Sequence, residues 1–71
     1  MSIDTSELLE QWKFVQPEFS EKLAKQVAYE IAEAKNEDDL RIIIRTIQAK
    51  AKTEARKTAL RIFKRMIKAI L

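Results

Sequence analysis

The chain has 71 residues, a formal net charge of +3 and 46% hydrophobic residues, and it contains no cysteine, histidine or glycine. This length and composition predict one helical domain over residues 1–71, rather than a disordered segment or several domains. The missing residue types exclude disulfides, thiolate metal sites, triads with a histidine base and glycine-rich phosphate loops, so we expect no enzyme activity, small-molecule substrate, cofactor or metal site.

The first predicted helix begins after Asp4 and ends near Val15. Asp4 is a favourable N-cap residue, and Glu7 follows it at the spacing of a capping box. Trp12 belongs to the apolar residues of this helix. Pro17 ends the helix, because the proline ring disfavours helical geometry at the residue before it.

A second predicted helix has Pro17 in its first turn, where proline is well tolerated. Glu18 and Lys22, like Glu21 and Lys25, have the i,i+4 spacing of stabilising ion pairs. The apolar side of this helix is expected to contain Phe19, Leu23, Val27, Ala28, Ile31 and Ala32.

The polar stretch AKNEDDL predicts a break before the next helix, which Asn36 or Asp38 would cap. From Asp38 to Leu71 no residue type interrupts a helix, but the apolar stripe changes side near Thr53. Thr53 followed by Glu54 is also typical of a capped helix start. We therefore expect an all-α bundle of three to four helices, with a break or kink near Thr53 or one long helix.

The last part of the chain separates cations from apolar residues around the helix. Five cations fall within roughly 100° and form what we name the basic arc: Lys57, Arg61, Lys64, Arg65 and Lys68. The apolar residues cover about 200°, which is more than one neighbouring helix can bury. We expect Ile62, Met66 and Ile70 to face the core. The flanking apolar residues complete the bundle or contact another chain, for example in a homodimer: Leu60, Phe63, Ile67 and Leu71.

Charge is divided between the two halves of the chain. Residues 1–40 contain four lysines and ten acidic residues, whereas residues 41–71 contain ten basic residues and the single acid Glu54. This division has two interpretations, which can both hold. In the first, the acidic helices lie against the basic ones. In the second, a basic surface is left facing a polyanion.

The basic arc predicts binding to nucleic acid, because clustered lysine and arginine side chains neutralise phosphates and release counterions. The arc contains no asparagine, glutamine or aromatic residue, so we expect little sequence preference and do not distinguish DNA from RNA. On this hypothesis the chain is a small accessory subunit of a nucleic-acid-processing complex. The absence of cysteine and of a secretory signal predicts a cytoplasmic location.

Two alternative functions stay open. A protein-interaction or self-associating scaffold module, natural or designed, would compensate its charges internally, and an exposed Trp12 would favour this function. A cationic helix with a wide apolar face is also typical of helices that lie at a membrane interface, although the acidic half of the chain opposes binding to anionic lipid. A membrane span is not expected, because the longest run of large aliphatic residues, Ile42 to Ile44, is far shorter than the roughly 20 residues required.

Overall fold

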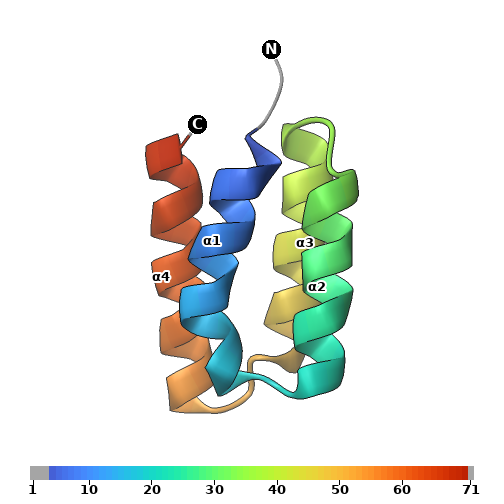
Figure 1. The fold of residues 1–71 in the computed structure, drawn as a ribbon. Helices are drawn as coiled ribbons and strands as arrows, with labels where there is room; N and C mark the ends of the chain where they lie inside the picture. The colour runs from blue at the N-terminus through green and yellow to red at the C-terminus, as the bar shows by residue number, and fades with distance from the viewer. Residues whose placement is uncertain (1–3, 71) are drawn as a thin grey trace.

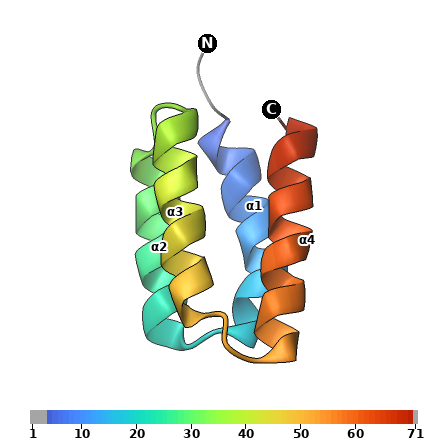
Figure 2. The same ribbon diagram turned by 180° about the vertical axis from the view of Figure 1, so that it is seen from behind.

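The computed structural model describes residues 4–70 and shows an all-α bundle of four helices (Figure 1). The elements in chain order are α1 (Thr5–Val15), a short 3-10 helix η1 (Gln16–Glu18), α2 (Glu21–Glu33), α3 (Glu37–Lys50) and α4 (Glu54–Ile70). Successive α-helices alternate in direction, so the start of α1 and the end of α4 lie at the same end of the bundle (Figures 1 and 2). Helices α1 and α3 each pack against both α2 and α4. The predicted all-α fold is confirmed.

A side chain caps the start of every α-helix. In each case its oxygen accepts a hydrogen bond from the backbone N–H three residues later, at 3.0 to 3.2 Å. The capping residues are Asp4, Ser20, Asn36 and Thr53. Such a bond satisfies one of the N–H groups that the first turn of a helix leaves unpaired. The predicted caps at Asp4 and Asn36 are confirmed, and the chain breaks fully at Thr53 rather than continuing as one long helix.

The segment around Pro17 differs from the prediction. Pro17 lies in η1, and α2 begins only at Glu21, after the cap formed by Ser20. Phe19 has an extended backbone between the two helices. Its ring therefore enters the core from the connecting segment and not from α2, because the capping hydroxyl of Ser20 sets the start of that helix.

Helix α2 otherwise follows the predicted pattern. Lys25 Nζ lies 3.3 Å from Glu21 Oε1, as the i,i+4 spacing predicts. The other predicted pair loses its helical spacing, because Glu18 precedes α2. Ala32 is exposed and does not belong to the buried side of the helix, which consists of Leu23, Val27 and Ile31.

Trp12 lies in the core of the bundle, to which all four α-helices contribute. Its side chain is only 1% exposed, and its ring centroid lies 5.6 Å from that of Phe19 and 5.3 Å from that of Phe63. The indole N–H donates a hydrogen bond to the carbonyl of Ala24 at 3.1 Å. The polar end of the ring is thus satisfied although it is buried. Trp12 is a core residue and offers no surface to a partner.

Helix α4 turns a different side to the core from the one predicted. Ile62 is 42% exposed, and Met66 and Ile70 are half-buried. At 100° per residue, the centre of the buried residues lies roughly 75° around the helix from the centre of these three. The large ring of Phe63 meets Trp12 edge-on, which gives this orientation a favourable aromatic contact. The buried side of α4 consists of Ala59, Leu60, Phe63 and Ile67.

The flanking apolar residues of α4 were predicted either to complete the bundle or to contact another chain, and this orientation decides between the two roles. Leu60, Phe63 and Ile67 are at most 7% exposed and complete the core of their own bundle. They therefore offer almost no surface to another chain while the bundle is intact. Leu71 lies outside the described residues.

Candidate functional site

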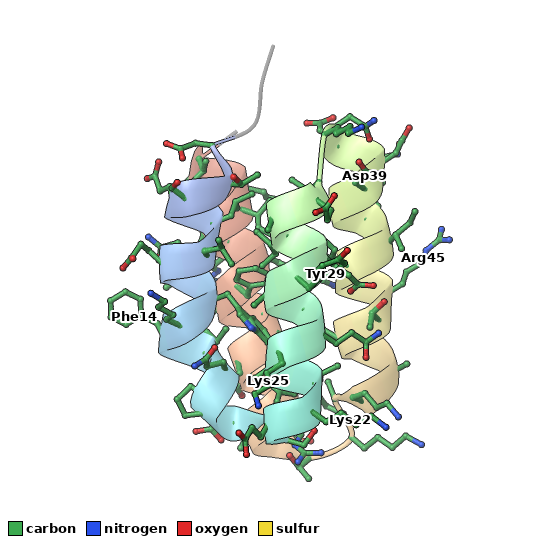
Figure 3. All side chains as sticks on the ribbon, turned by 45° about the vertical axis from the view of Figure 1, so that its right-hand side comes forward. Phe14, Lys22, Lys25, Tyr29, Asp39 and Arg45 are labelled. Atoms are coloured by element: carbon green, nitrogen blue, oxygen red, sulfur yellow. The ribbon has the colours of Figure 1, made fainter. Side chains whose placement is uncertain are left out.

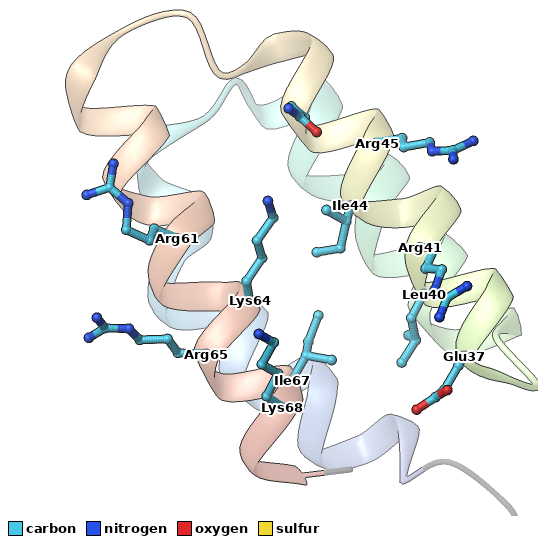
Figure 4. Close-up of a pocket in the computed structure, with 11 residues that line it drawn as sticks. Glu37, Leu40, Arg41, Ile44, Arg45, Arg61, Lys64, Arg65, Ile67 and Lys68 are labelled. Carbon is cyan, nitrogen blue, oxygen red and sulfur yellow. The ribbon is translucent and has the colours of Figure 1, made fainter.

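A groove between α3 and α4 gathers cations from both helices (Figure 4). Its volume is about 620 Å³, which lies within the range of ligand-binding sites. Glu37 and Gln48 also line it. The cations that line the groove are Arg41 and Arg45 from α3 and Arg61, Lys64, Arg65 and Lys68 from α4.

The floor of the groove is apolar. Leu40 and Ile67 are buried there, and Ile44 is half-buried and packs against the core. The lysine and arginine side chains add their aliphatic stems to this surface while their charged ends reach water. A ligand in the groove would therefore meet positive charge and apolar surface together.

The orientation of α4 explains why the cations lie beside α3. The centre of the basic arc is roughly 130° around α4 from the centre of its buried side. The arc therefore points outward and to one side: Lys64 and Lys68 lie on the side of α4 toward α3, whereas Arg61 and Arg65 lie farther from it. Arg41 and Arg45 stand one turn apart on α3 and meet the arc at this groove.

Most of the basic arc lies in the groove. Lys57 lies outside it, in an adjoining hollow that shares Arg61 and Lys64 with the groove. Lys57 Nζ also lies 3.7 Å from Glu54 Oε1 on the same helix. The members of the arc that line the groove are Arg61, Lys64, Arg65 and Lys68.

The side chains of the groove point in two ways in Figure 4. Lys64 extends into the space between α4 and α3, toward the level of Ile44. Arg61 and Arg65 project from the outer side of α4, and Arg45 projects from the outer side of α3. A long anionic ligand would thus find charge within the groove and along both of its edges.

Ion pairs neutralise little of this charge. Arg41 is paired within α3, with its Nη1 3.6 Å from Asp38 Oδ1 and both side chains exposed. No other cation of the groove forms an ion pair with a residue in the range 4–70. Every ion pair in this range joins two residues of one helix. The acidic helices α1 and α2 therefore do not pair with the cations of α3 and α4.

Arg41, Arg45 and Gln48 were not among the predicted site residues. The two arginines flank the apolar stripe of α3 at Leu40 and Ile44, which is the sequence signal that they border a partly covered face. Their contribution to the site depends on how α3 faces α4, and helical periodicity alone does not give that relationship. Gln48 supplies an amide group, which the basic arc itself lacks.

Two smaller surfaces expose large apolar side chains (Figure 3). Phe14 is 74% exposed and lines a hollow between α1 and α4 together with Ile62. Tyr29 and Ile42 line another hollow between α2 and α3, which also has acidic side chains. Figure 3 shows Phe14 projecting from α1 and Arg45 projecting from α3.

The described residues show neither a metal site nor a membrane span. Among residues 4–70, acidic side chains do not come together in groups of three or more that could hold a metal ion. Within the same range, every helix is too short or too polar to cross a bilayer. Comparisons of the chain with protein-family models, with curated proteins and with solved structures found no match.

Proposed function

We propose that this chain is a non-enzymatic protein that binds nucleic acid in the groove between α3 and α4, through phosphates and with little sequence preference. The observation that supports the proposal is the meeting of six cations from two helices at one groove. Five of them form no ion pair with another residue of the described range 4–70, so their charge is available to a ligand. The cytoplasmic location expected from the sequence belongs to the same proposal.

The chemistry of these cations predicts how binding depends on salt and on sequence. Each lysine or arginine that neutralises a phosphate releases condensed counterions, so added salt opposes binding. For three to five engaged phosphates of duplex DNA, log K should fall against log salt with a slope of roughly −3 to −4.5. Contacts to phosphates carry no sequence information, and only Gln48 brings an amide to the groove.

A gel-shift series tests the proposal. It compares the native chain with a variant in which all five residues of the basic arc are changed to glutamate, and circular dichroism establishes that the variant still folds. We expect the native chain to shift DNA at low salt and the folded variant not to shift it. Equal binding by both proteins, or no binding by the native chain, would reject the proposal.

Protein–protein interaction is a second candidate function, favoured by the hollow at Phe14 and Ile62. Both side chains are exposed and line the same surface between α1 and α4. Adjacent exposed apolar side chains of this size are typical of interaction sites. Sedimentation across a concentration series tests the self-associating form of this function: association that Phe14→Ser abolishes would support it, and a monomer at all concentrations would reject it.

A further inference from the structure

We infer that the groove between α3 and α4 holds single-stranded nucleic acid, with bases against its apolar floor and phosphates on the cations of α4. This inference rests on the proposed function and specifies its ligand. The observation that carries it is the combination of cationic walls with an apolar floor, on which Ile44 is the accessible side chain and Leu40 and Ile67 lie buried beside it. Phosphate binding alone explains the walls but gives no role to the floor.

The two forms of nucleic acid differ in what they present to such a surface. A duplex stacks the faces of its bases inside and presents phosphates, sugars and base edges to a protein. A single strand can turn the faces of unstacked bases toward apolar side chains while its phosphates meet cations. A single strand therefore matches both the walls and the floor of the groove.

The distribution of charge gives the strand its orientation. Four of the six cations belong to α4. From Arg61 to Lys68 the helix rises about 10.5 Å, so these cations follow α4 for about two turns. The phosphates would thus follow α4, and the bases would lie toward Ile44 and Gln48 on α3.

Electrostatics alone predicts the opposite preference, which makes the inference testable. Each neutralised phosphate makes the slope of log K against log salt steeper by about 0.9 on duplex DNA and by about 0.7 on a single strand, because the duplex has the higher charge density. A purely electrostatic groove would accordingly bind the duplex at least as tightly. Tighter binding of the single strand has to come from contact between bases and the floor.

The experiment measures fluorescence anisotropy of a labelled oligothymidylate and of a labelled duplex of equal length, at one salt concentration. We expect the native chain to bind the single strand at least about threefold more tightly. Ile44→Thr should weaken single-strand binding about threefold and leave duplex binding unchanged. Ile44→Phe should strengthen single-strand binding about fivefold or more, because an aromatic ring on the floor adds base stacking.

Ile42→Thr is the matched control. Ile42 is on the same helix and is exposed, but it lines the hollow between α2 and α3 and not the groove. This substitution should change neither affinity. Thermal melts followed by circular dichroism identify any variant that fails to fold, and the gain expected for Ile44→Phe cannot arise from unfolding.

The outcomes separate this inference from the function on which it rests. Three outcomes would overturn the inference and leave the proposed function standing. The first is equal binding of the two forms, and the second is preference for the duplex. The third is a single-strand preference that neither Ile44 variant changes. Binding of neither form by the native chain would remove the proposed function and the inference with it.

Discussion

Arg45 on α3 and Lys64 on α4 line the same groove from its two walls, although a loop and most of a helix separate them in the sequence. Their approach depends on the break at Thr53, which turns the chain back so that α4 runs antiparallel to α3. The positive groove is therefore a product of tertiary structure. A continuous helix from Glu37 onward would have kept these cations on separate parts of one rod.

Reversing the charge of Arg45 and Lys64 should weaken binding to nucleic acid. We expect the variant with both residues changed to glutamate to bind duplex DNA at least tenfold more weakly at low salt. The slope of log K against log salt should become shallower by about 2, because two phosphate contacts are lost. Fluorescence titration at several salt concentrations measures both quantities.

The control for this variant changes Lys22 and Lys25 to glutamate. Both lysines are exposed on α2 and neither lines the groove (Figure 3). The change in net charge is identical, so any effect of overall charge appears in both variants. If the two variants weaken binding equally and with the same salt slope, the groove is not the binding surface.

Substitutions at neighbouring positions of α4 should have very different effects on stability. Phe63→Ala removes a buried ring that contacts Trp12, and we expect it to lower the free energy of unfolding by about 3–5 kcal/mol. Ile62→Ala removes an exposed side chain and should cost less than about 1 kcal/mol. Urea denaturation of both variants measures the difference. The opposite ranking would show that α4 presents Ile62 to the core.

The cap at Thr53 should contribute to the stability of α4. Thr53 Oγ1 accepts a hydrogen bond from the backbone N–H of Arg56 at 3.2 Å. We expect Thr53→Ala to lower the free energy of unfolding by about 1 kcal/mol. Thr58→Ala is the matched control, because Thr58 is exposed within α4 and alanine has the higher helix propensity there. Thermal melts that rank the two variants equally would contradict a capping role.

The emission of Trp12 should report the folded core, since it is the only tryptophan of the chain. Its ring is buried between Phe19 and Phe63 in the native bundle. We therefore expect emission at a shorter wavelength in the native state than in urea, and weak quenching by iodide before unfolding. A native emission maximum equal to that in urea would place this ring in water.

Local signals in the sequence predict the boundaries of most helices. Asp4, Asn36 and Thr53 are residues whose short polar side chains bond the backbone of the turn that follows, so they mark helix starts without any knowledge of the fold. The start of α2 was predicted wrongly. Pro17 and Ser20 both favour a helix start, and the structure uses the hydroxyl of Ser20 for the cap.

The rotation of α4 could not be predicted in the same way. Its apolar residues cover about twice the arc that one neighbour buries, so several orientations bury a similar number of them. The choice depends on the rings that meet in the core, above all on the contact between Phe63 and Trp12. The sequence predicted the four residues of the basic arc that line the groove. It did not predict Arg41 and Arg45, because they join the arc only through the way in which α4 is rotated against α3.

The most direct test of the central proposal is the salt dependence of binding between the native chain and duplex DNA. A fluorescence titration at a series of salt concentrations should give a plot of log K against log salt with a slope of roughly −3 to −4.5. That slope would correspond to three to five phosphates held by the cations of the groove. A slope near zero, or no binding at low salt, would contradict the proposal that this groove binds nucleic acid.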